Sequence, residues 1–363
     1  MATSRKAKLA LAAVIVIASI AGFFFAFLHP HDRPTSRQQL LEFIPSDATA
    51  VVYLDFEDLK NSPFLTSLYA WAAKPAEDSE YSQFVRDSGF SYERDLERVM
   101  IAVSHRSSAA EVFVVADGKF DRTKIASYLE RNAKAAQQGK WKTYLLNATM
   151  ADKPMSIAFL SDNRVAMSNS ENFSAQIAAT SAAANRAEWN SRFERLAGTP
   201  AFAVIRQDSS VQEAIGSVAP GGFSSPQLAS LLGQLQWISI AGKPEGDQLR
   251  LVAEGESLSD QVSSQLREVL QGVLLLAQSG LNDPKLRQRM APEARETYVN
   301  LLRGTEIQKL DRGDWKSVRV VLAITPQFLE LARRTSLAPQ STEEAKPAQK
   351  TAKPEKLKPQ ARK

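Results

Sequence analysis

The stretch TAVVYLDFEDLK, residues 49–60, contains six strand-like residues followed by three carboxylates within four positions. Its apolar run, Thr49–Leu54, is typical of a buried strand. A second short apolar run behind turn residues, PAFAVI at residues 200–205, has the same character. Two matching strands in one chain indicate an internal repeat, which predicts a fold built from two related units.

Aligning residues 44–180 with residues 197–335 extends the match beyond the first strand. Short helices follow it in each half, and their starts share a serine N-cap before proline, at Ser62-Pro63 and Ser225-Pro226. Each half then predicts a hairpin, a helix, two closing strands and a final helix. The hairpin strands are Val99–Val103 with Val112–Val115, and Trp237–Ile240 with Leu249–Val252.

The helices after the hairpins are expected to begin at Asp121 and at Ser257 or Ser259. Their apolar positions are Ile125, Leu129, Ala133 and Ala136 in the first half, and Val262, Leu266, Val269, Val273 and Leu276 in the second. The closing strands are Tyr144–Leu146 with Ile157–Leu160, continuing at Val165–Met167, and Glu306–Leu310 with Val318–Ile324. His105 falls in the expected turn of the first hairpin.

These elements predict an α+β fold with a mostly antiparallel sheet covered by helices on one side. The pattern leaves open whether the two units share one sheet. The predicted organisation is a basic end at residues 1–8, a transmembrane helix at 9–28, a linker at 29–42, a first repeat at 43–180, a linking helix at 181–199, a second repeat at 200–337 with a helical insertion at 283–304, and a disordered basic tail at 338–363.

The segment from Leu9 to Leu28 has 20 residues without a charge. As a helix it is about 30 Å long, which matches the hydrocarbon thickness of a bilayer. Three basic residues precede it and two occur in the next 20, so the N-terminus is predicted to be cytoplasmic and the rest periplasmic or extracellular. A cleaved signal peptide is the alternative, but the length of the run favours a single-pass anchor in the cell (inner) membrane.

The net charge of +5 is concentrated at the two ends of the chain. Residues 1–8 contribute +3 and residues 338–363 contribute +4, and subtracting both leaves −2 for the residues between. The tail predicts either contact with a polyanion, such as an anionic cell-wall polymer, or a solubilising tether. Its lack of aromatic residues argues against specific nucleic-acid binding. The predicted contact residues are Lys346, Lys350, Lys353, Lys356, Lys358, Arg362 and Lys363.

The sequence contains no constellation that predicts catalysis, a cofactor or a metal. Cysteine is absent, which excludes thiolate chemistry and disulfides. Asp55, Glu57 and Asp58 lie where a strand meets a helix, and carboxylates there satisfy free backbone N–H groups and the positive end of the helix dipole. The equivalent positions in the second half are Arg206 and Asp208, so the cluster is not repeated.

Four phrases of the first half carry a resemblance to a known group of proteins. They are FIPSDA leading into VVYLDF from Phe43, GFSYERDLERVMIAV from Gly89, VVADGKFDRTKIASYL from Val114, and FLSDNRVAMSNSENF from Phe159. The chain resembles uncharacterised bacterial single-pass membrane-anchored proteins with a duplicated extracytoplasmic α+β domain. The resemblance implies anchorage and a binding or scaffolding role, and it brings no catalytic residues.

The sequence therefore favours a membrane-anchored extracytoplasmic protein that binds or scaffolds an envelope partner without catalytic activity. One alternative is an envelope hydrolase that uses the carboxylates near Asp55. Another is a polyanion-binding protein that acts through the Lys/Pro-rich tail.

Overall fold

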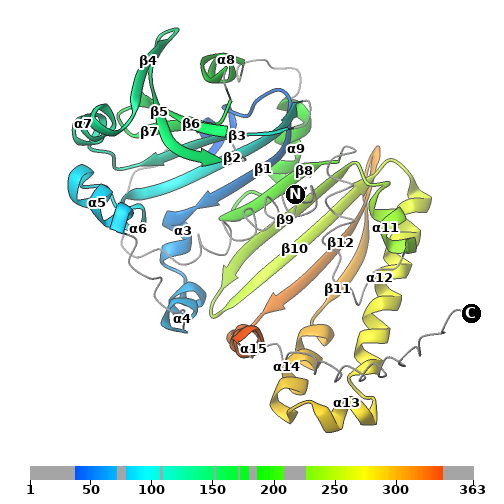
Figure 1. Ribbon diagram of the computed structural model, residues 1–363. Coiled ribbons are helices and arrows are strands. Elements are labelled where there is room, and N and C mark those ends of the chain that lie inside the picture. Colours follow the sequence, from blue (N-terminus) through cyan, green and yellow to red (C-terminus); the bar gives the residue numbers. More distant parts are fainter. Residues whose placement is uncertain are drawn as a thin grey trace, which may run out of the picture.

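The computed structural model describes residues 37–71, 79–106, 109–150, 153–170, 172–179, 186–207 and 226–337 (Figure 1). The expected transmembrane segment at residues 9–28 and the tail at residues 338–363 lie outside these ranges. Within the ranges, no helix is both long and apolar enough to cross a bilayer. The anchor therefore stays a prediction.

The first half of the chain contributes strands β1 to β7 and helices α2 to α8. The strands are β1 (Ala48–Asp55), β2 (Leu96–Arg106), β3 (Ala109–Gly118), β4 (Lys134–Gln138), β5 (Trp141–Met150), β6 (Lys153–Ser161) and β7 (Arg164–Ser168). The helices are α2 (Arg37–Leu41), α3 (Phe56–Lys60), α4 (Pro63–Trp71), α5 (Ser79–Ser88), α6 (Tyr92–Asp95), α7 (Arg122–Asn132) and α8 (Phe173–Ala179).

The second half begins with helix α9 (Arg186–Arg195), inside the segment that predicted a linking helix. Its strands are β8 (Ala201–Arg206), β9 (Trp237–Glu245), β10 (Gln248–Ser257), β11 (Glu306–Arg312) and β12 (Trp315–Ile324). Its other helices are α11 (Pro226–Leu232), α12 (Asp260–Gly280), α13 (Pro284–Arg289), α14 (Pro292–Arg303) and α15 (Pro326–Leu337). Helices α13 and α14 occupy the predicted helical insertion.

All of these strands form one antiparallel sheet in the order β11-β12-β10-β9-β8-β1-β2-β3-β7-β6-β5-β4 (Figure 1). The two halves meet where β1 pairs with β8, with Val52 opposite Ala203 and Tyr53 opposite Phe202. The rings of Tyr53 and Phe202 stack with centroids 5.1 Å apart. The α+β class with a large antiparallel sheet covered by helices is confirmed, and the sheet is continuous across both halves.

Helices cover both faces of the sheet, so the prediction of helices on one side is wrong. On the face that carries Val52, here called the Val52 face, residues such as Phe56, Leu65 and Ile125 bring α3, α4 and α7 onto the strands. On the opposite face, the Tyr53 face, α2, α8 and α9 contribute Leu40, Phe173 and Trp189. The reason lies in the central strands, which are apolar on both faces and need cover on both.

The strands after α7 differ from the prediction, because four are present where two were expected. Helix α7 ends at Asn132, so Ala133 and Ala136 do not extend it, and Ala136 pairs with Thr143 in the β4–β5 hairpin. Gly139 has a φ of +60°, which fits the tight turn of that hairpin. Cross-strand hydrogen bonds to β5 outweigh the helix preference of alanine here. His105 also differs, since it lies in β2 opposite Ala110.

Side-chain caps hold the helix starts as the sequence predicts. The Leu65 N–H donates to Ser62 Oγ at 3.2 Å, and the Lys124 N–H donates to Asp121 Oδ1 at 3.1 Å. Of the two candidate caps of α12, Ser259 is the one used, since its Oγ accepts from the Val262 N–H at 3.3 Å. Each cap satisfies a backbone donor that has no partner inside its own helix.

Candidate functional site

The acidic cluster after β1 holds the junction between a strand and a helix. Asp55 is the N-cap of α3, and its Oδ1 accepts from the Asp58 N–H at 3.3 Å. Arg98, on the neighbouring strand β2, binds Asp55 at 2.9 Å and Glu57 at 2.5 Å. The Tyr53 hydroxyl donates to Asp55 Oδ2 at 3.1 Å. The interpretation of Asp55 as a helix cap is confirmed.

The electrostatics of this cluster agree with a structural role. Burial, followed by the nearby Asp55 carboxylate, raises the pKa of the Tyr53 hydroxyl, which therefore stays protonated and donates. Burial alone lowers the pKa of Arg98, but the carboxylates of Asp55 and Glu57 raise it overall. Burial and then Asp55 raise the pKa of Asp58. The Arg98 guanidinium is permanently charged, and both Asp55 and Glu57 bind it.

Within the described residues, no group of three or more acidic or histidine side chains is placed to hold a metal ion. Arg206, the second-half counterpart of Asp55, ends strand β8, and Asp208 lies outside the described residues. The predicted polyanion contacts of the tail, from Lys346 to Lys363, also lie outside them.

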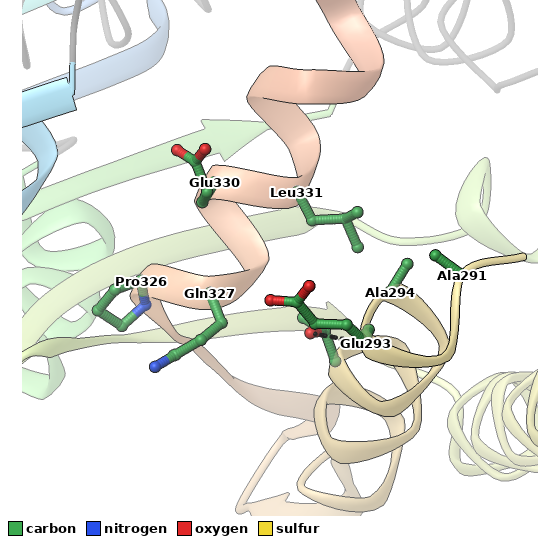
Figure 2. Close-up of a pocket in the computed structure, with 8 residues that line it drawn as sticks. Ala291, Glu293, Ala294, Pro326, Gln327, Glu330 and Leu331 are labelled. Carbon is green, nitrogen blue, oxygen red and sulfur yellow. Dashed lines mark hydrogen bonds between the residues drawn. The ribbon is translucent and has the colours of Figure 1, made fainter.

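A cavity of about 480 Å³ lies between the first turns of α14 and α15 (Figure 2). It brings together two carboxylates, Glu293 and Glu330, with Gln327 and Thr297 nearby. The Thr297 hydroxyl is already used, because it donates to the Glu293 carbonyl at 2.9 Å. Two carboxylates without a third ligand do not form a closed metal site.

A second cavity, of about 390 Å³, lies between α2 and α9. Its lining includes Arg37, whose guanidinium donates to the carbonyls of Phe193 and Leu196 at the end of α9. The same guanidinium lies over the ring of Phe202 at 4.5 Å and over that of Tyr53 at 5.3 Å. Burial lowers the pKa of Arg37. Arg37 therefore anchors α2 to α9, and Glu42, Asn190 and Glu194 also line the cavity.

A buried ion pair that the sequence analysis did not identify joins α9 to the Tyr53 face of the sheet. Arg192 is 1% exposed, and its Nη2 donates to Glu256 of β10 at 2.6 Å. Arg195 contacts the other oxygen of Glu256. The Arg192 guanidinium also lies 3.9 Å from the ring centroid of Trp237 and 4.9 Å from that of Trp315. Burial lowers the pKa of Arg192, opposed by the Glu256 carboxylate.

The sequence contained a signal for this pair. Trp189 and Phe193 mark the apolar face of α9, and a residue three positions after Trp189 lies on the same face. Arg192 occupies that position. Its partner could not be identified in the same way, because Glu256 is 64 positions away.

In each half, an ion pair also joins the second strand of the hairpin to the strand beside it, and the two pairs lie at matching places. Asp117 of β3 lies opposite Arg164 of β7, and Arg164 binds it with two nitrogens at 2.6 and 2.9 Å. Glu254 of β10 lies opposite Arg319 of β12 and is bound at 2.8 Å, with Arg312 also in contact. Burial would raise the pKa of Glu254, but its hydrogen bonds to Arg312 and Arg319 lower it overall. Both pairs tie the hairpin to the strand that closes each half.

No protein-family model matches the chain, and no curated protein matches it. Among solved structures, crystal forms I, III and IV of TP0453 are similar at 10% sequence identity, with TM-scores of 0.42 to 0.43. The match covers 81% to 82% of this chain and 96% to 98% of TP0453. A likeness at this level assigns neither a family nor an activity to the chain.

Proposed function

We propose that this chain is a single-pass protein of the cell (inner) membrane, with a cytoplasmic N-terminus and a folded part that lies outside the cytoplasm. The observation that carries the proposal is the uncharged apolar segment from Leu9 to Leu28, which has the length of a membrane span. The excess of basic residues before that segment supports the orientation.

The folded part is proposed to bind or scaffold an envelope protein or an anionic cell-wall polymer, without catalysis. The strongest candidates for chemistry support this, because Asp55 and Glu57 are both occupied by Arg98. The buried acids Asp117, Glu254 and Glu256 are likewise bound by arginines. Removing one partner of such a buried pair leaves an uncompensated charge, which fits a structural role for these acids.

We also propose that residues 43–180 and 200–337 are copies of one unit. The strand path β1-β2-β3-β7-β6 on one side of the junction has the same form as β8-β9-β10-β12-β11 on the other. At the junction, Val52 and Ala203 occupy the same position in the sequence alignment and pair with each other, which is the register that a two-fold axis produces. Matching ion pairs in the two halves support the same origin.

The membrane topology is tested with reporters fused after Lys363, one active only in the cytoplasm and one active only outside it. We expect activity from the outside reporter alone, and the protein should stay in the membrane fraction after alkaline carbonate washing. Activity from the cytoplasmic reporter would contradict the proposed orientation. Release by carbonate would contradict the anchor.

A further inference from the structure

The cavity between α14 and α15 has a lining that matches one kind of side chain. Its volume of about 480 Å³ is within the range of small-ligand sites. The lining is apolar at four positions, Ala291, Ala294, Pro326 and Leu331. Two acids, Glu293 and Glu330, also line it, and no basic residue of the described chain does. Apolar surface beside carboxylates matches a side chain with an apolar stem and a cationic end, which is the chemistry of lysine.

Glu293 is the acid that points into this space. It lies in the first turn of α14, and its carboxylate extends toward α15 (Figure 2). Its side chain is exposed, and no basic residue among the described ones forms an ion pair with it. Arg295, the nearest base along α14, donates to the Leu281 carbonyl at 2.8 Å and to Asn282 Oδ1 at 2.9 Å. The positive charge closest to Glu293 in the sequence is therefore directed to the end of α12 and not into the cavity.

The chain continues beyond α15 with a segment of complementary charge. Residues 338–363 contain seven basic residues and three acids, a net charge of +4. Three of the lysines stand directly before a proline, in the pairs Lys346-Pro347, Lys353-Pro354 and Lys358-Pro359. A proline next to the lysine adds an apolar ring and fixes its own backbone φ, so that less conformational freedom is lost on binding.

The first of these pairs is close enough along the chain to reach the cavity. On α15, the lining residue farthest from the tail is Pro326, eleven positions before Leu337, the last residue of the helix. Eleven helical positions correspond to about 17 Å. The nine residues from Leu337 to Lys346 span up to about 30 Å when extended. A tether of this length keeps the local concentration of the tail in about the millimolar range, so a weak contact is sufficient.

We infer that the cavity between α14 and α15 binds the tail of the same chain through Lys346 and Pro347. The Lys346 ammonium group contacts the Glu293 carboxylate, and the Pro347 ring packs on the apolar lining. The inference goes beyond the function proposed above and does not depend on the membrane anchor. It has a consequence for the tail, because a Lys346 side chain that is held in the cavity is not available to a polyanion.

The absence of cysteine allows a disulfide test in the full-length protein. Gln327→Cys places a thiol at an exposed position of the cavity lining, and Ala345→Cys places one beside Lys346. The double variant is kept in detergent at low protein concentration under mild oxidation. The rate of disulfide formation within one chain is measured by electrophoresis without reductant and by the loss of free thiol.

In this background we expect Glu293→Gln to slow the disulfide by about three- to fivefold, the size of a charge contact at a partly exposed site. The matched control is Glu296→Gln, which removes the same charge from an exposed position of α14 that does not line the cavity, and it should leave the rate unchanged. Lys346→Gln should have the same effect as Glu293→Gln. Combining these two should add little, because each removes the same contact.

Two outcomes would overturn the inference. One is an equal rate for Glu293→Gln and Glu296→Gln, which would show that the cavity does not select the tail. The other is a disulfide that joins two chains and forms faster at higher protein concentration, which would show that the cavity takes the tail of a second copy. Neither outcome bears on the anchor, which the carbonate wash tests separately.

Discussion

At the scale of single residues, the molecule depends on buried arginines that are shared between a carboxylate and aromatic rings. Arg192 shows the arrangement most fully, since Glu256 binds its head and Trp237 and Trp315 flank it. Taking a charge out of water is costly, and the cost is offset only when an opposite charge and hydrogen bonds are in place. Glu256 is completely buried, so it depends on this partner.

Arg192→Ala should therefore destabilise the protein by about 3–5 kcal/mol, because Glu256 loses its buried partner and keeps only the partly exposed Arg195. Equilibrium urea unfolding of the full-length protein in detergent measures the change. The matched control is Arg122→Ala, whose ion pair with Asp162 is mostly exposed and should contribute less than about 1 kcal/mol. Equal effects of the two substitutions would contradict the role of Arg192.

At the scale of elements, β3 and β10 each contain a glycine near their end, at a point where another segment comes close. The neighbouring group differs between the two strands. A Cβ on Gly118 would lie 2.5 Å from the backbone oxygen of Asp95, whereas a Cβ on Gly255 would lie 2.6 Å from the end of the Leu235 side chain. A backbone oxygen cannot move without moving its element, and a leucine methyl can rotate away.

Gly118→Ala should thus be the more damaging change, by about 1–3 kcal/mol, while Gly255→Ala should cost less than about 1 kcal/mol. Gly272, in α12, has open space around it, and Gly272→Ala should stabilise by about 0.5–1 kcal/mol through helix propensity. Thermal unfolding of the three variants gives the order. A reversed order for Gly118 and Gly255 would show that Leu235 is the more rigid neighbour.

The final helices differ between the halves despite their similar places in the sequence. Phe173 of α8 lies in the core of the Tyr53 face, whereas Leu329 of α15 packs against the core of the Val52 face. Helix α15 also contacts α14, where the rings of Tyr298 and Phe328 meet edge to face with centroids 5.9 Å apart. The insertion that contains α14 therefore accompanies a different position of the last helix.

At the scale of the whole molecule, the junction between β1 and β8 joins the two halves into one sheet. Besides the strand pairing, the Arg37 guanidinium of α2 donates to backbone carbonyls at the end of α9. The ring centroids of Phe193, in α9, and Phe202 lie 5.6 Å apart. The buried residues at the junction come from both halves. Each half alone would leave its junction strand, β1 or β8, as an unpaired edge.

Cleavage at a protease site placed within residues 181–185 should leave the two pieces associated in mild detergent and separable only in urea, because the junction is a continuous ladder with a shared core. Size-exclusion chromatography after cleavage provides the measurement. Each half produced alone should aggregate, since its junction strand is an exposed apolar edge. Free separation of the pieces without denaturant would contradict the role of the junction.

The sequence by itself determined the features that depend on neighbouring residues. The strand at Thr49–Leu54, the caps at Ser62 and Asp121, and the α+β class follow from local hydrogen bonding and from the spacing of apolar residues. For α12 the sequence narrowed the cap to Ser257 or Ser259, and the structure uses Ser259. These interactions act over two to four positions, so a short stretch contains all the information that they need.

Only the tertiary structure decided how those elements combine. It placed helices on both faces, joined the halves into one sheet, and brought Arg98 to Asp55 and Arg192 to Glu256, which are 43 and 64 positions apart. The physical reason is that a buried charge needs a partner, but its own sequence neighbourhood does not specify which residue of the opposite sign the fold will bring to it.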